Sequence, residues 1–198
     1  MNGGSPRAWQ RMLSGRRLDL LDPSPLDVEL EDIAHGLARV ARWNGQTKGD
    51  HAFSVAQHSM LVEQIMRLLN PNMSNAHRLY ALLHDAPEYV IGDMISPFKS
   101  VVGGAYKEVE ARLESAIHRR VGLPSEPDPR LKKSIKRADR IAAYFEATEL
   151  AGFEAAEADK FFGRPSNVTL DQLDLTPLPT LQAQQVFHQR LLSVMDQA

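Results

Sequence analysis

Cysteine is missing from the 198-residue sequence. A disulfide framework, a thiolate nucleophile and a cysteine-ligated zinc site are therefore excluded, and any metal site must be built from His, Asp and Glu. The sequence also has no apolar run approaching the roughly 18 residues of a membrane-spanning helix. Its first residues lack the apolar stretch of a signal peptide. We therefore expect a cytoplasmic protein that has no membrane partner.

Neither positive nor negative charge predominates in the sequence. The chain carries 23 Lys and Arg against 25 Asp and Glu, a formal net charge of -2, which does not predict a nucleic-acid polymer as a partner. A small phosphorylated substrate such as a nucleotide needs only a few local cations, so this class of substrate stays open. Hydrophobic residues make up 43% of the chain, an ordinary share for a globular domain with a sizeable core.

Apolar residues recur at helical spacing in several segments, and none shows the alternation expected of a strand. The expected helices cover residues 28–40, 53–70, 75–86, 106–121, 131–150 and 180–195. The pattern therefore predicts an all-α fold, a single-domain bundle of six or seven helices.

Segments rich in glycine, proline or polar residues separate these helices. Residues 1–27 show no sustained period and are expected to form a partly irregular leader to a helical domain spanning residues 28–198. The segment 153–179 is acidic, then punctuated by prolines, and we expect it to be irregular before the last helix. Residues 41–50 are polar and contain glycines, which predicts a loop.

Four polar side chains border apolar helix faces in the expected bundle. Asp139 lies among apolar neighbours, where an ionised carboxylate is costly unless it is paired or bound to a metal. His84 and Asp85 follow an apolar stretch directly, and His58 lies in the first turns of its helix. Each alone is compatible with a structural role, such as an ion pair with a nearby arginine or a hydrogen-bonded core histidine.

Taken together, the four side chains predict a metal site, because helical bundles assemble such sites from facing helices. Two imidazoles and two carboxylates suit one divalent transition metal, that is Mn, Co, Fe, Ni or Zn. The set also leaves coordination positions open for water and substrate.

The order of these residues, H…HD…D, resembles the defining pattern of the HD superfamily of phosphohydrolases. HDAPEYVIGDMISPFK over residues 84–99 is similar to the HDA-x-E-x-x-x-GD-x-x-x-P-x-K segment of the bacterial 5′-deoxynucleotidases in that superfamily. KRADRIAAYFEATEL over residues 136–150 is similar to their last ligand helix, and Arg42-Trp43 to an Arg-Trp pair of the same enzymes. The resemblance covers roughly residues 33–150 and implies the HD-domain fold, with the metal held by His58, His84, Asp85 and Asp139.

The resemblance also implies roles for residues around the metal. Glu88, three residues after Asp85, would orient or deprotonate a water if the helix continues past Pro87. Without the resemblance, a surface carboxylate is the simpler interpretation. Asp93 corresponds to a substrate-binding or acid/base residue of the enzymes that the sequence resembles. Its structural alternative is a hydrogen bond to the local backbone, which is common for an Asp after a glycine.

Four further residues are candidate substrate contacts. Arg42 can clamp a phosphate or sugar bidentately, and Trp43 can stack on the base or sugar. A surface salt bridge and a core aromatic are their structural alternatives. Lys48 in the polar loop and Lys99 near the end of the motif are candidate phosphate contacts.

The resulting hypothesis is a nucleotidase that releases phosphate from (deoxy)nucleoside 5′-monophosphates by attack of metal-bound hydroxide. A dNTP triphosphohydrolase is an alternative, which would need more cations near the metal than the motif supplies. A non-catalytic, metal-containing nucleotide-binding module is another. A homodimer is also left open.

Overall fold

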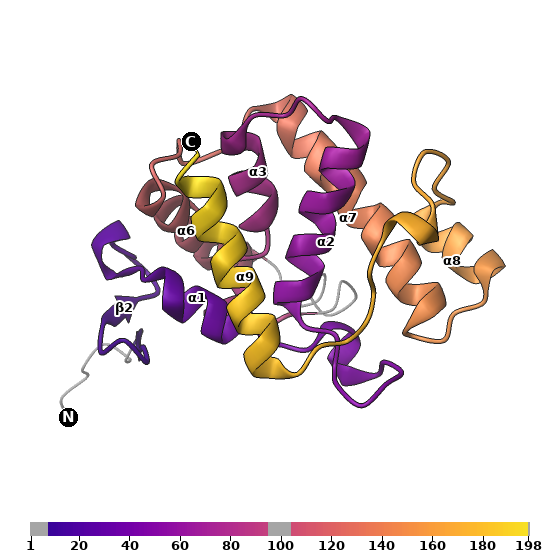
Figure 1. Ribbon diagram of the computed structural model, residues 1–198. Helices are drawn as coiled ribbons and strands as arrows, with labels where there is room; N and C mark the ends of the chain where they lie inside the picture. The colour runs from indigo at the N-terminus through magenta and orange to yellow at the C-terminus, as the bar shows by residue number, and fades with distance from the viewer. Residues whose placement is uncertain (1–7, 95–103, 198) are drawn as a thin grey trace.

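Helices account for most of the structure, a computed structural model that describes residues 8–94 and 104–197 (Figure 1). The described part contains eight α-helices: α1 Leu30–Leu37, α2 Val55–Leu69, α3 Asn75–Leu82, α4 Glu88–Ile91, α6 Gly104–Arg120, α7 Pro129–Glu149, α8 Ala155–Phe162 and α9 Thr180–Met195. It also contains three short 3-10 helices: η1 Pro25–Asp27, η2 Arg42–Gly45 and η3 Leu170–Gln172. The predicted helical single domain is confirmed, with more helices than the six or seven expected.

The absence of strands was a wrong prediction. Strands β1 Trp9–Arg11 and β2 Arg17–Asp19 pair antiparallel and form a hairpin within the leader. Each strand is only three residues long, too short for an alternating pattern to be recognisable. Leu18 is the hairpin's one fully buried side chain, and the loop is fixed to α1 because the Ser14 amide and hydroxyl both donate to the Asp32 carboxylate.

Helix ends follow local capping chemistry. The Ser54 side chain accepts a hydrogen bond from the Gln57 amide at the start of α2, and Asp128 caps the start of α7 in the same way. The last helix has the predicted bounds. In contrast, α3 ends at Leu82, short of the predicted end at residue 86. Helix α8 lies inside the segment 153–179, which we expected to be irregular. The apolar face of α8 is too short to show a helical period in the sequence.

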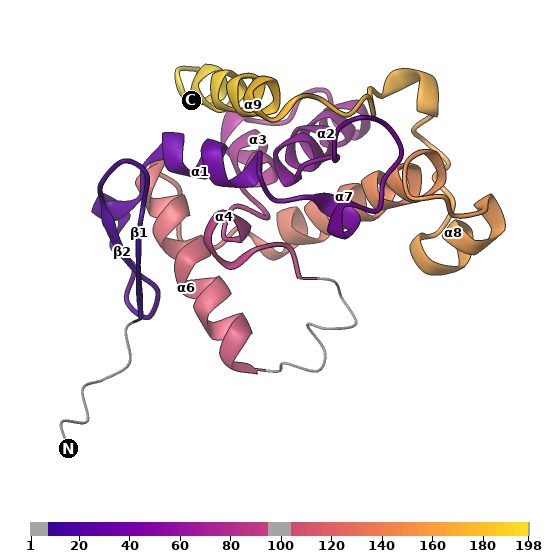
Figure 2. The same cartoon turned by 90° about the horizontal axis from the view of Figure 1, so that it is seen from below.

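Helix α2 lies at the centre of the bundle, in contact with α3, α7 and α9. Figure 2 shows α9 lying across one side of the molecule, over α1, α2 and α3. Helix α1 packs on α4 at a distance that only glycine permits, since a Cβ on Gly36 would lie 2.7 Å from both the Cβ and the carbonyl oxygen of Tyr89. This close approach draws the segment that follows His84 against the rest of the bundle.

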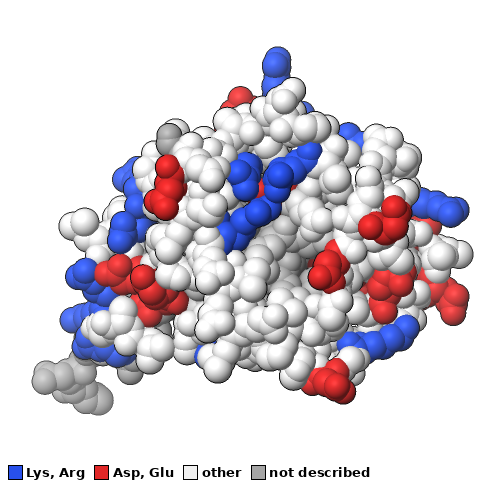
Figure 3. Space-filling view, viewed as in Figure 1, with Lys and Arg blue, Asp and Glu red and all other residues white. Residues whose placement is uncertain are grey.

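A buried carboxylate links three of these helices. Glu63 of α2 is fully buried and forms ion pairs with Arg78 of α3, at 2.6 Å, and Arg190 of α9, at 2.8 Å. On the face shown in Figure 3, basic and acidic side chains are interspersed. Among the described residues, no helix is both long enough and apolar enough to cross a membrane.

Candidate metal centre

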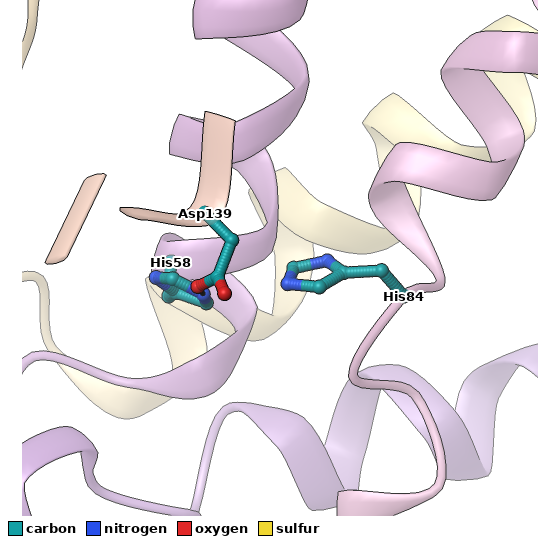
Figure 4. A group of neighbouring side chains, drawn as sticks. All are labelled: His58, His84 and Asp139. Carbon is teal, nitrogen blue, oxygen red and sulfur yellow. Dashed lines mark ion pairs between the residues drawn. The ribbon is translucent and has the colours of Figure 1, made fainter. Parts of the chain in front are cut away.

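Three predicted ligands come together from separate elements. His58 lies in the first turns of α2, His84 in the turn after α3, and Asp139 midway along α7. One donor atom from each lies within 4.8 Å of the other two, so the three residues could hold a metal ion. Figure 4 shows their side chains directed toward one another.

Asp85 lies beside this group. Its Oδ2 atom is 3.5 Å from Nε2 of His58 and 3.2 Å from Nε2 of His84. Neighbouring residues on a helix diverge by about 100°, which would make it difficult for His84 and Asp85 to reach one ion. Because α3 ends at Leu82, both residues lie in a turn, and that constraint does not apply.

Both imidazole rings are fixed through their Nδ1 atoms. Nδ1 of His58 lies 2.5 Å from Oε1 of Glu146, and Nδ1 of His84 lies 2.8 Å from the backbone oxygen of Ala81. Oxygen acceptors at Nδ1 favour the tautomer that leaves the Nε2 lone pair available to a metal.

The Nε2 atoms provide a test of whether a metal fits. Both are buried and make no hydrogen bond within residues 8–94 and 104–197. Nε2 of His58 instead lies 3.3 Å from Oδ1 of Asp139. Buried polar atoms without hydrogen bonds are costly, whereas two such nitrogens facing carboxylate oxygens suit a divalent cation. The residues present therefore fit a metal ion.

Glu146 of α7 is the residue that holds His58, and it is not among the residues predicted from the sequence. It is fully buried. Its Oε2 atom accepts hydrogen bonds from Nε1 of Trp43, at 2.9 Å, and Nε of Arg42, at 3.2 Å. A signal was present: Glu146 follows Asp139 by seven residues, two helical turns, and so lies on the same face of α7.

The charges of the site shift the pKa values of its members. Burial raises the pKa of Glu146, but the positive charges of Arg42 and His58 outweigh burial and hold it at about 2. Burial lowers the pKa of His58, as does Arg42. The surrounding carboxylates, first among them Glu146, outweigh both and raise this pKa well above its usual 6.5. The electrostatics of the site therefore favour positive charge, whether protons or a metal ion.

Arg42 and Trp43 lie against this centre in a turn of unusual backbone. Trp43 and Asn44 both have positive φ angles, 56° and 51°, a conformation that is rare for residues other than glycine. Nη1 of Arg42 forms an ion pair with Oδ2 of Asp93 at 3.1 Å. Arg42 therefore links the predicted catalytic residue Asp93 to Glu146.

Three further residues were predicted to lie at the site: Glu88, Lys48 and Lys99. Glu88 is 2% exposed and begins α4. It does so after a break, so the continuous helix past Pro87, on which the predicted alignment of Glu88 with Asp85 depended, is not formed. The Lys48 side chain is exposed, and its backbone amide donates to the Leu150 oxygen. Lys99 lies outside the described residues.

Comparison with known proteins identifies the family. An uncharacterized protein of Rhodobacter capsulatus is 57% identical over 179 residues, which cover 89% of this chain and 91% of the relative. A family model described as 5′-deoxynucleotidase YfbR-like matches residues 32–193, a range that includes every residue of the metal centre. The chain belongs to the YfbR-like 5′-deoxynucleotidase family, a branch of the HD-domain phosphohydrolases.

Proposed function

We propose that this protein is a metal-dependent nucleotidase that releases phosphate from (deoxy)nucleoside 5′-monophosphates. The observation that carries the proposal is the convergence of His58, His84 and Asp139, with both Nε2 atoms buried and directed at carboxylate oxygens. Family membership supports the class of reaction and of substrate.

The proposed ligands are His58, His84, Asp85 and Asp139, holding one divalent transition ion such as Mn, Co, Fe, Ni or Zn. When bound, such an ion supplies Lewis-acid chemistry, lowering the pKa of a water molecule so that phosphorus can be attacked near neutral pH. Glu146 and the Ala81 carbonyl keep the two imidazoles oriented for this role.

Other side chains of this chain act on the substrate and on protons. Glu88, buried at the start of α4, holds the proton that leaves the attacking water. Asp93 positions Arg42 through their ion pair and serves as the second acid/base group. Arg42 contacts the phosphate or the sugar, and Trp43 forms a wall beside the nucleoside.

Lys48 and Lys99 complete the proposed substrate contacts, each binding a phosphate oxygen. Both are candidates because of their places in the sequence.

A substrate panel tests the proposed reaction. Purified protein loaded with Mn²⁺ or Co²⁺ is incubated with nucleoside and deoxynucleoside mono- and triphosphates, and released phosphate is measured. Hydrolysis of monophosphates to nucleoside and phosphate is expected. Release of intact triphosphate, or no hydrolysis of any phosphoester by fully metallated protein, would refute the proposal.

Metal content tests the proposed ligands separately from turnover. Wild-type protein is expected to hold about one ion per chain, and Asp139→Ala to lose it. Asp171→Ala is the matched control, since Asp171 is exposed on η3. Elemental analysis after dialysis gives the stoichiometry, and equal metal in all three proteins would exclude Asp139 as a ligand.

A further inference from the structure

A cavity of about 300 Å³ lies between α7 and the segment that follows α8. Five of the residues that line it carry a positive charge: Lys133, Lys136, Arg137, Arg140 and Arg164. None of its lining residues is acidic. The chain as a whole has a net charge of -2, so this concentration of cations is local.

The cations of the cavity lack the carboxylate partners that several other arginines have. Elsewhere, Arg16, Arg42, Arg78 and Arg190 each form an ion pair with a carboxylate. In the part of the chain that the structure describes, the five cations of the cavity form no ion pair. Like charges therefore gather here without a carboxylate at ion-pair distance, and a bound anion would lower their mutual repulsion.

Local contacts give the cavity a defined shape. Nη2 of Arg140 donates to the Phe162 carbonyl at 3.1 Å, which joins α7 to the end of α8. Gly163 turns the chain there with a φ of 77°. Phe162 contributes an aromatic side chain to the lining, and Ser166 and Asn167 contribute polar groups.

The cavity is distinct from the metal centre. None of the proposed metal ligands lines it. Arg140 directly follows Asp139, and adjacent residues on a helix point about 100° apart. One helix, α7, therefore presents a carboxylate to the metal centre and several cations to the neighbouring cavity.

We propose that this cavity binds a small ligand that carries several phosphate groups, such as inorganic triphosphate or a nucleoside triphosphate. Several linked phosphates can engage several cations at once, which a single phosphate cannot. A volume of about 300 Å³ is at the lower end for small-molecule sites. This inference does not rest on the proposed nucleotidase activity.

Calorimetry tests the binding site. The full chain is titrated with inorganic triphosphate and with a non-hydrolysable nucleoside triphosphate analogue, and one ligand per chain is expected. Lys136→Glu combined with Arg164→Glu should weaken binding at least about 100-fold, because each lost charge-assisted hydrogen bond contributes roughly tenfold or more. Affinity should also fall as salt is raised.

A double variant with the same change of charge serves as the control. Lys107→Glu combined with Lys160→Glu alters exposed lysines of α6 and α8 that do not line the cavity, and binding should be retained. If both double variants weakened binding equally, the loss of affinity would depend on net charge and not on the cavity, and the proposal would be overturned. The ligand would instead lie at the metal centre if Asp139→Ala abolished binding while Lys136→Glu combined with Arg164→Glu left it unchanged. This result would also overturn the proposal.

Comparing inorganic triphosphate with the nucleoside triphosphate analogue shows whether the cavity recognises the phosphates alone or a nucleotide. Tighter binding of the nucleotide, lost on Phe162→Leu, would show that the base stacks on Phe162. Equal affinity would show that the phosphates alone are recognised, and both results support the cavity as the site. Binding only of a nucleic-acid oligomer, with neither triphosphate bound, would refute it. Because no turnover is measured, failure here is distinguishable from failure of the nucleotidase proposal.

Discussion

Replacing Glu146 by glutamine tests whether this buried carboxylate holds the metal centre in place. The substitution keeps the shape of the side chain and removes its charge. One carboxylate now accepts hydrogen bonds from His58, Trp43 and Arg42. A glutamine must direct its amide NH₂ group either at Trp43 and Arg42, where the contacts become repulsive, or at Nδ1 of His58, which must then move its proton to Nε2.

The pKa of Glu146 gives the size of the expected effect on stability. A shift from 4.5 to about 2 corresponds to about 3 kcal/mol of stability from the ionised form. Removing one partner of a buried ion pair generally lowers the free energy of unfolding by about 3–5 kcal/mol. We therefore expect Glu146→Gln to lower it by about 3–4 kcal/mol, or Tm by roughly 6–16 °C for a chain of this size.

The pH dependence of this loss follows from the lowered pKa. The contribution of Glu146 is fully present above pH 4.5 and is lost as the pH falls from 4.5 toward 2. The difference between wild type and Glu146→Gln should therefore be constant above about pH 5 and should shrink below it. Denaturant unfolding in the presence of a chelator measures this contribution without the metal.

Metal affinity is the second measurement on the same variant. Residues that orient a ligating histidine typically contribute 10–100-fold to metal affinity, so competition with a chelating dye should show a loss of that size. Glu149→Gln is the control, because Glu149 lies on the same helix with an exposed side chain. Wild-type stability and metal affinity in Glu146→Gln would refute the positioning role.

Three further predictions concern the metal centre and the packing of the bundle. Metal affinity should increase as the pH rises above 6.5, by up to about tenfold per unit for each proton displaced, because the raised pKa values of His58 and His84 make protons compete with the ion; a dissociation constant that does not change between pH 6 and 8 would contradict this. Gly36→Ala should lower the free energy of unfolding by about 1–3 kcal/mol, because the new methyl group overpacks against Tyr89, and unchanged thermal unfolding would show that the helices can separate freely. Glu63→Gln should cost about 3 kcal/mol in denaturant unfolding, since two arginines lose their buried partner, and an effect below 1 kcal/mol would mean that solvent replaces it.

The long helices could be predicted from the sequence because their burial pattern is regular over many turns. Helix α9 has the bounds that its apolar spacing predicted, and α7 begins and ends within two residues of the expected range. The hairpin could not be predicted in this way, because strands of three residues are too short to show a period. Its position depends on distant contacts, such as that of Ser14 with Asp32.

The candidate metal centre could be predicted in part for a similar reason. His58, His84 and Asp139 were identifiable because polar side chains border apolar faces in a recognisable order. Glu146 was not identified, because a carboxylate in a buried stretch has no apparent function until its partners are known. Those partners, His58 and Arg42, lie 88 and 104 residues away in the sequence, and only the tertiary structure brings them together.

The hydrogen bond from Trp43 to Glu146 gives the protein an internal optical probe. Indole emission responds to nearby charge, and the Nε1 atom of Trp43 lies 2.9 Å from the carboxylate that holds His58. The chain has two tryptophans, and the other, Trp9, lies in the hairpin with the guanidinium of Arg17 over its ring. A Trp9→Phe protein would therefore have a single tryptophan, at the candidate metal centre, so that ion binding and release could be followed in real time without a label.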